Sequence, residues 1–142
     1  MRRVSTTTIS FLAASALAVF AIVGVGVSAQ SPGGNPEAAK IKNPVPMTAA
    51  SIEAGKATYT KNCRFCHGDE AKGDGKMAPK DSHPSDLTDA KWDRGSTDGE
   101  IFAVIQNGAG PKFEMKGFKG RMTDQQTWEV IDYLRSIGPQ KK

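Results

Sequence analysis

The pentapeptide Cys63-Arg64-Phe65-Cys66-His67 constrains this chain more than any other feature. Two cysteines three residues apart on a helical turn point to the same side, and the histidine that follows can turn its ring toward that side. This C-x-x-C-H spacing predicts covalent attachment of one haem c, with Cys63 and Cys66 as the thioether cysteines and His67 as the proximal iron ligand. Only 38% of the 142 residues are apolar, so a bound ligand would add mass to a small core.

Three other interpretations of these residues are open at this stage. A thioredoxin-like redox pair would need a strand–turn–helix setting, of which the sequence shows no sign. A zinc site could draw on Cys63, Cys66, His67 and His83, although the adjacent Cys66 and His67 suit a tetrahedral site poorly. A disulfide between Cys63 and Cys66 would leave His67 and the small core unexplained.

The N-terminus has the composition of an export signal. Arg2 and Arg3 precede an uncharged apolar run from Ile9 to Val27, and the small residues Ser28 and Ala29 follow it. We predict a signal peptide over residues 1–29, cleaved after Ala29. The alternative is an uncleaved membrane anchor, because the run is long enough to span a bilayer. Both interpretations place the rest of the chain outside the cytoplasm, in the periplasm, and membrane contact is expected only if residues 9–27 are retained.

Charge and cysteine content exclude some classes of protein. Without residues 1–29 the chain has 17 basic and 15 acidic residues, a balance too even to indicate a nucleic-acid partner. Two cysteines rule out a dense disulfide scaffold, and the length indicates one folded domain. Residues 30–47 are rich in proline and glycine and predict a flexible linker, so the folded domain is expected over residues 48–142.

Three segments of that domain have helical periodicity: about 48–62, 98–107 and 124–136. The last two begin with the capping boxes Thr97/Glu100 and Thr123/Gln126. Residues 68–96 have no alternating apolar pattern that would indicate a strand. The sequence therefore predicts an all-α fold of three main helices and long loops, which would be wrapped around a large rigid ligand.

A second iron ligand would have to come from the chain beyond His67. The candidates are Met77, His83, Met115 and Met122. Met115 is favoured because it lies in a polar, glycine-rich segment with little core to fill. Met122 is at a position typical of packing, Met77 is too close to His67 to reach the opposite face easily, and His83 is expected on the surface.

Several stretches, in order, resemble the single-haem class I bacterial cytochromes c. They are Gly55–Tyr59 followed by the C-x-x-C-H motif, Gly73-Asp74-Gly75, Pro84-Ser85-Asp86-Leu87-Thr88, Met115–Asp124 and Trp128–Arg135. The resemblance covers about residues 48–138 and implies a small cytochrome c fold around one haem, with Met115 as the distal ligand. Many members have proline where this chain has Lys116. The family also implies a backbone carbonyl bound to the proximal imidazole, which we assign to Pro79.

Ligation by His67 and Met115 would leave the iron six-coordinate, with no open position for a substrate. We therefore expect an electron-transfer protein rather than an enzyme: a one-electron carrier between extracytoplasmic or membrane redox partners. If Met115 does not bind, the alternative is a five-coordinate haem sensor or peroxidase-like protein. A further alternative is a membrane-tethered cytochrome subunit of a larger respiratory complex.

Basic residues surround the expected Met115 loop. They are Lys112, Lys116, Lys119 and Arg121, and residues 101–121 carry four bases and one acid, whereas residues 69–100 carry nine acids and five bases. This asymmetry predicts weak electrostatic docking of an acidic redox partner at the Met115 loop, sensitive to salt. The alternative is a solvated loop without a partner.

Overall fold

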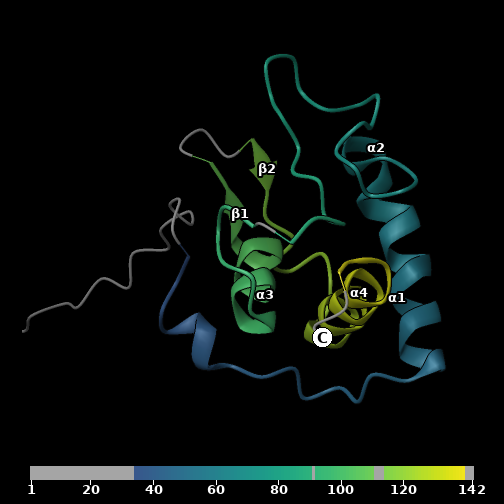
Figure 1. The fold of residues 1–142 in the computed structure, drawn as a ribbon, viewed down its shortest axis with the longest axis vertical. Coiled ribbons are helices and arrows are strands. Elements are labelled where there is room, and N and C mark those ends of the chain that lie inside the picture. The colour runs from purple at the N-terminus through teal and green to yellow at the C-terminus, as the bar shows by residue number, and fades with distance from the viewer. Residues whose placement is uncertain (1–33, 91, 111–113, 140–142) are drawn as a thin grey trace, which may run out of the picture.

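The computed structural model describes residues 34–90, 92–110 and 114–139. The expected signal peptide or anchor, the start of the expected linker and Lys112 lie outside the described residues. The elements are η1 (Ala38–Lys40), α1 (Ala49–Asn62), α2 (Arg64–His67), α3 (Asp98–Asn107), β1 (Gly108–Ala109), β2 (Met115–Lys116) and α4 (Asp124–Ile137) (Figure 1). Within the described residues, no helix has the length and apolarity needed to cross a membrane.

The three long helices confirm the helical segments predicted from the sequence, to within one residue at each end. Each helix starts at a threonine whose side chain accepts a hydrogen bond from the third residue of the helix, while that residue's side chain accepts one in return. The pairs are Thr48/Ser51, Thr97/Glu100 and Thr123/Gln126. These reciprocal bonds satisfy backbone N–H groups that have no partner within the helix, so they fix where each helix begins.

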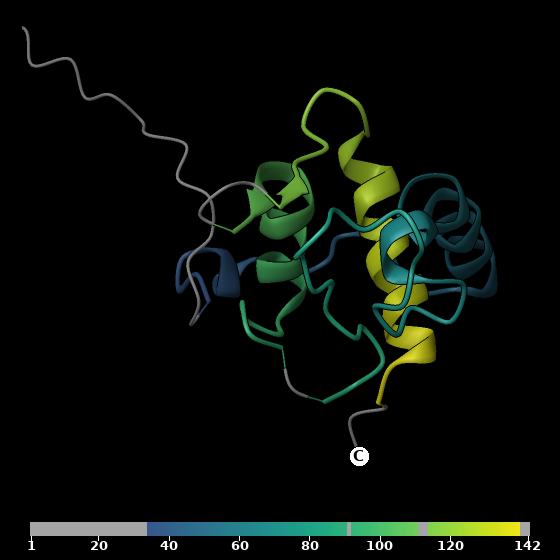
Figure 2. The same ribbon diagram turned by 90° about the horizontal axis from the view of Figure 1, so that it is seen from above.

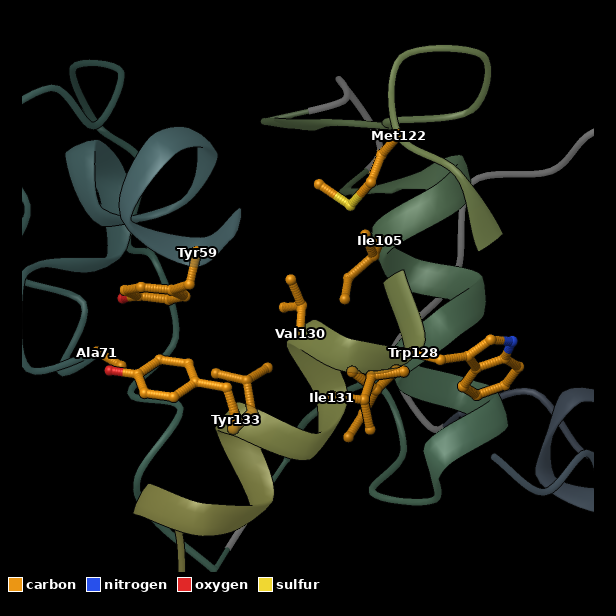
Figure 3. Close-up of a cluster of buried hydrophobic side chains, with 10 residues drawn as sticks. Tyr59, Ala71, Ile105, Met122, Trp128, Val130, Ile131 and Tyr133 are labelled. Carbon is orange, nitrogen blue, oxygen red and sulfur yellow. The ribbon is translucent and has the colours of Figure 1, made fainter. Parts of the chain in front are cut away.

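Helix α4 forms the centre of the domain, with α1 packed on one side and α3 on the other (Figures 1 and 2). Its predicted apolar stripe is buried: Trp128 is 6% exposed, Ile131 0% and Leu134 4%. Phe102 of α3 stacks on Trp128 with ring centroids 4.1 Å apart. Figure 3 shows Ile131 of α4, Ile105 of α3 and Tyr59 of α1, which belong to one buried apolar cluster shared by the three helices.

Strands β1 and β2 form one short antiparallel pair, with Gly108 opposite Lys116 and Ala109 opposite Met115. This pair was not predicted from the sequence, because strands of two residues are too short to show an alternating pattern. Strand β1 directly follows the last residue of α3, so its pairing with β2 fixes the position of Met115 relative to that helix.

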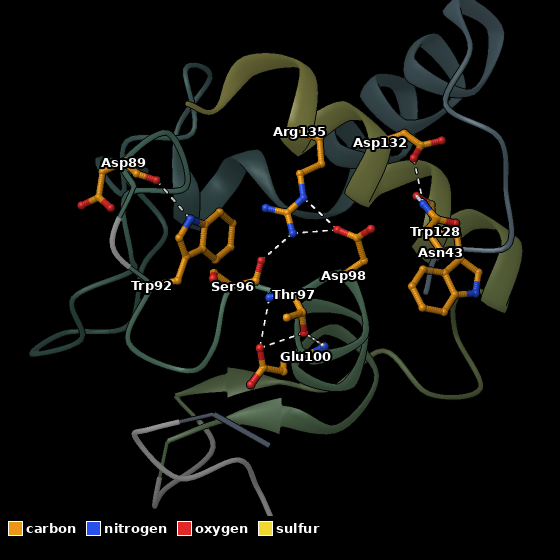
Figure 4. Close-up of polar contacts among 10 residues, drawn as sticks. All are labelled: Asn43, Asp89, Trp92, Ser96, Thr97, Asp98, Glu100, Trp128, Asp132 and Arg135. Atoms are coloured by element: carbon orange, nitrogen blue, oxygen red, sulfur yellow. Dashed lines mark hydrogen bonds and ion pairs between the residues drawn. The ribbon is translucent and has the colours of Figure 1, made fainter. Parts of the chain in front are cut away.

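Residues 34–47, here called the N-terminal strap, lie across the domain; they are part of the segment for which composition predicts a flexible linker. The backbone N–H of Asn35 donates to Glu100 Oε1 at 3.0 Å. The side chain of Asn43 donates to Asp132 Oδ1 at 2.8 Å and to the carbonyl oxygen of Trp128 at 3.2 Å (Figure 4). The strap is therefore held by α3 near one end and by α4 near the other.

The long loop between α2 and α3 folds back onto α1. The buried hydroxyl of Tyr59 donates to the carbonyl oxygen of Gly68 at 2.7 Å. The side chain of Ala71 is fully buried, and its carbonyl oxygen accepts from Leu87 N–H at 2.7 Å. These bonds bring the residues around Leu87 back beside α2, where they contribute to the site described next.

Candidate functional site

The two cysteines and the histidine lie on one helical turn. Cys63 follows the last residue of α1, and its backbone N–H donates to Tyr59 O at 2.8 Å. The backbone N–H of His67 donates to Cys63 O at 3.0 Å. Both thiols, those of Cys63 and Cys66, are free and half-buried. The short helix α2 thus presents two thiols and an imidazole from a single turn, as the motif predicts.

Burial keeps the thiol of Cys63 protonated. Burial, followed by the charge of the neighbouring Cys66, raises the pKa of the Cys63 thiol to about 12. The thiol of Cys66 donates to the backbone carbonyl oxygen of Met77 at 3.5 Å. A neutral Cys63 thiol is poorly suited to a redox pair that needs a low-pKa thiolate.

The imidazole of His67 is oriented by the loop. Its Nδ1 lies 3.2 Å from the backbone carbonyl oxygen of Ser85. This contact places the proton on Nδ1 and leaves Nε2 as the free ligand atom. Burial lowers the pKa of His67, against the opposing effect of the Ser85 hydrogen bond, which favours the neutral imidazole that a metal requires.

The assignment of this carbonyl to Pro79 was wrong. The carbonyl oxygen of Pro79 instead accepts from the backbone N–H of Ser82 at 2.9 Å and from its hydroxyl at 2.7 Å. Pro79 therefore closes a local turn with Ser82, and the contact with His67 is made by a residue further along the loop. The residue that sequence reasoning missed, Ser85, acts through its backbone, so its side-chain type carried no signal.

Met115 lies on β2, half-buried against the apolar cluster. In Figure 1, strand β2 and helix α2 lie at the same end of the molecule, on different sides of α4. The other three candidates for a distal ligand are in different surroundings. Met77 is 68% exposed, His83 is exposed on the loop, and Met122 is 6% exposed within the apolar cluster (Figure 3).

The residues present suit a covalently bound haem. The donor set consists of two free thiols, an imidazole with Nε2 free and a thioether on another element. Large apolar side chains that pack against the cluster without being fully buried include Leu87, Trp92, Phe102, Met115 and Phe118. In the part of the chain that the structure describes, no three His, Cys, Asp or Glu residues are grouped so that they could hold a metal ion.

Comparison with protein families identifies the domain. The family described as cytochrome C oxidase, cbb3-type, subunit III matches residues 50–134, which is more than half of the chain. The chain belongs to this family. It is a c-type cytochrome domain, and its cofactor is covalently attached haem c.

Two curated relatives illustrate the relationship. The cbb3-type cytochrome c oxidase subunit FixPc of Rhizobium leguminosarum bv. viciae is 36% identical over 94 residues, which cover 66% of this chain and 30% of that protein. The cbb3-type cytochrome c oxidase subunit CcoP of Rhodobacter capsulatus is 32% identical over 98 residues, covering 66% and 31%. This cytochrome domain therefore spans about a third of the length of the relatives it matches.

Solved structures share the fold. The reducing HAO-like protein complex Kustc0457/Kustc0458 of Kuenenia stuttgartiensis matches with a TM-score of 0.60 and 26% identity, covering 71% of this chain and 49% of that one. Cytochrome cL from Hyphomicrobium denitrificans matches with a TM-score of 0.55 and 21% identity, covering 69% and 53%. These neighbours confirm the predicted small all-α cytochrome fold.

Proposed function

We propose that this cytochrome domain is a one-electron carrier in which Cys63 and Cys66 hold the haem, His67 is the proximal iron ligand and Met115 is the distal one. Haem iron bound by an imidazole and a thioether changes oxidation state with little change in geometry. The observation that carries the proposal is the single turn of α2, on which two free thiols and an imidazole with a fixed tautomer are presented together.

The protein's part in this function is to hold two ligands rigidly from two different elements. The Ser85 carbonyl prevents the His67 ring from rotating, because rotation would break the hydrogen bond at Nδ1. The β1–β2 pair holds the backbone of Met115 next to the end of α3. Rigid ligands keep the structural change on oxidation small, and this favours fast electron transfer over ligand exchange.

We further propose that the domain works outside the cytoplasm and passes electrons within a respiratory chain. The basic start, apolar run and small residues of 1–29 support export, either as a cleaved signal or as a retained anchor. The curated relatives are named as subunits of cbb3-type cytochrome c oxidases. Their names favour the tethered-subunit form of the proposal, and mass spectrometry of the mature N-terminus separates it from a free carrier.

The first experiment is production of the full chain in a host that has a haem-attachment system. We expect the mature protein to gain the mass of one haem, and replacement of both cysteines by alanine to remove it. In the ferric protein we expect a far-red sulfur-to-iron band that disappears in Met115→Ala and persists in the control Met77→Ala. A high-spin wild-type spectrum with rapid binding of CO to the reduced protein would contradict the carrier and support the five-coordinate alternative.

We also propose that Lys116, Lys119 and Arg121 contribute to docking of an acidic redox partner. All three are exposed. The Arg121 guanidinium lies 4.6 Å from the Phe118 ring centroid and donates to Gly117 O at 2.7 Å, so it adds fixed positive charge beside the Met115 loop.

The test measures the rate at which the reduced cytochrome passes electrons to membranes that contain a cbb3-type oxidase. Lys119→Glu should slow the reaction at low ionic strength and flatten its salt dependence, whereas Lys56→Glu on the exposed face of α1 should change it less. Equal effects of the two substitutions would remove the docking proposal.

A further inference from the structure

We infer that the buried hydrogen bond between Gln106 and Thr127 positions the segment that carries Met115. The inference rests on the proposed ligation by Met115 and adds a positioning pair to it. Gln106 Nε2 donates to Thr127 Oγ1 at 2.6 Å. Gln106 is 7% exposed and Thr127 is 0% exposed, so the bond is shielded from water and joins the end of α3 to the start of α4.

The backbone carbonyl groups of Ile105 and Gln106 also accept hydrogen bonds from the segment that follows Met115. The N–H of Phe118 donates to Ile105 O at 2.9 Å. The N–H of Lys119 donates to the carbonyl oxygen of Gln106 at 3.0 Å. The segment is therefore hydrogen-bonded to the last turn of α3, and its position depends on where that turn lies.

The approach between the two backbones is close. A Cβ atom built on Gly117 would lie 2.5 Å from the carbonyl oxygen of Gln106 and 2.7 Å from the carbonyl carbon of Asn107. Only glycine permits this contact without displacement. A shift of the C-terminal end of α3 would therefore displace Gly117, which is two residues from Met115, because the two backbones are in close contact.

Thr127 connects this terminus to the rest of the domain. Its hydroxyl accepts from Gln106 and donates to the carbonyl oxygen of Thr123 at 3.0 Å, in the first turn of α4. Helix α4 packs along α1, which leads directly into Cys63. The Gln106–Thr127 bond thus links the Met115 segment, through α3 and α4, to helix α1, which leads into Cys63.

A second polar contact joins the same two helices at the opposite end and provides a matched control. Arg135 of α4 donates to Asp98 Oδ1 of α3 through Nε at 2.8 Å and through Nη2 at 2.7 Å (Figure 4). This contact is at the N-terminal end of α3, away from the Met115 segment. Breaking it should loosen the α3–α4 contact without moving the ligand.

The test measures imidazole binding to the ferric holoprotein, because imidazole competes with the distal ligand. Thr127→Val removes the hydroxyl at nearly constant shape, and Thr127→Ser keeps it. We expect Thr127→Val to raise the apparent imidazole affinity about tenfold, which corresponds to about 1.4 kcal/mol, and Thr127→Ser to stay close to wild type. Asp98→Ala should lower the urea midpoint without changing imidazole affinity.

A second substitution guards against misfolding of Thr127→Val. Gln106→Leu removes the donor while Thr127 keeps its bond to Thr123, and we expect the same rise in imidazole affinity. If both substitutions lower the urea midpoint and leave the affinity unchanged, the positioning role is overturned and Met115 ligation stands. If Met115→Ala itself leaves the affinity unchanged, Met115 is not the ligand, and both the ligation and the positioning role are overturned.

Discussion

The Nδ1 atom of His67 lies 3.2 Å from the backbone carbonyl oxygen of Ser85, which is 18 residues further along the chain. The loop that returns to His67 is fixed by its own backbone bonds. The N–H of Gly73 donates to the carbonyl oxygen of His67 at 2.9 Å, and that of Leu87 donates to Ala71 O at 2.7 Å. The orientation of the proximal ring is therefore a property of the loop fold, and changes in the loop should be visible in the metal centre.

Gly73→Ala should disturb this contact. Gly73 has φ of +80°, and a Cβ there would collide with the carbonyl oxygen of Pro84, directly before Ser85. We expect a loss of stability of about 1–3 kcal/mol, from strain and displacement together. We also expect a higher reduction potential, because an imidazole without its Nδ1 acceptor donates less electron density to the iron.

Gly120→Ala is the control for that substitution. Gly120 also has positive φ, +77°, but a Cβ there would meet nothing within 4 Å. The backbone strain is therefore similar while the contact with the His67 loop is untouched, so stability should fall by about 1 kcal/mol and the potential should stay unchanged. Voltammetry and urea unfolding of both variants measure these effects, and equal potentials for the two would refute the link between the loop and the iron.

Glu100 should stabilise the domain above acidic pH. Burial by itself raises the pKa of Glu100, but hydrogen bonds from Thr97, Asn35 and Ser96 outweigh it and hold the pKa below the ordinary value of 4.5. A lowered folded-state pKa gives stability that is present above the ordinary value and lost as the pH falls through the folded one. Glu100→Gln should cost about 1–2 kcal/mol at neutral pH, since it weakens charge-assisted bonds to the α3 cap and the strap.

Urea unfolding at neutral and acidic pH measures this effect. The difference between wild type and Glu100→Gln should shrink in acid, where both side chains are neutral. Glu53→Gln, on the exposed surface of α1, is the control for loss of one charge. A difference that stays constant across pH would contradict the assignment.

Asp132 should show the opposite dependence on pH. Burial raises its pKa above 3.8, and the charges of Asp98 and Glu129 add to this, although the neighbouring Ser51 side chain opposes the rise. Its Oδ2 atom is buried without a hydrogen-bond partner, whereas Oδ1 accepts from Asn43. A raised folded-state pKa gives stability that is present when the carboxyl is protonated and lost as the pH rises through the raised value.

Asp132→Asn should therefore stabilise the domain at neutral pH by about 1–2 kcal/mol, because the amide oxygen can still accept from Asn43 while no charge is buried. The gain should disappear in acid. Denaturant unfolding over a pH series measures it, with Asp93→Asn on the exposed loop as the control. A loss of stability at neutral pH would show that the carboxylate is needed for the strap.

The helices were predictable because their signals are local. Thr97 with Glu100 and Thr123 with Gln126 mark helix starts through residues three apart, and the structure places the helices there. The C-x-x-C-H turn was predictable for the same reason, since its spacing fits within one helical turn.

Other features depend on single contacts between distant residues and leave no pattern in the sequence. Asn43 reaches Asp132 across 89 positions, and a composition of proline and glycine gives no sign of such a bond. The Ser85 carbonyl reaches His67 only because the loop takes a particular path, which includes positive φ at Ala71 and Asp81. Backbone acceptors and unusual loop conformations leave no periodic pattern of apolar residues. The contacts of the strap and the partner of His67 could therefore be identified only from the structure.

Gly55→Ala tests the helix crossing on which the whole site depends. Gly55 of α1 is buried against α4, and a Cβ there would overlap the backbone carbonyl of Glu129 and approach Tyr133 Cβ to 3.0 Å. Alanine is the better helix former by about 1 kcal/mol, so helix propensity alone predicts stabilisation. The overlap is with backbone that cannot rotate away, and forced overpacking costs about 1–3 kcal/mol, so we expect net destabilisation.

The effect of Gly55→Ala should also reach the iron site. Moving α1 away from α4 displaces Cys63 relative to the α4 end that is bonded to Gln106, so the far-red ferric band should weaken together with the urea midpoint. Ala57→Gly, at an exposed position of α1, should lower the midpoint by about 1 kcal/mol through propensity and leave the band intact. Stabilisation by Gly55→Ala would show that α1 can move away from α4 without cost. It would contradict the proposal that these helices hold the two iron ligands in a fixed relative position.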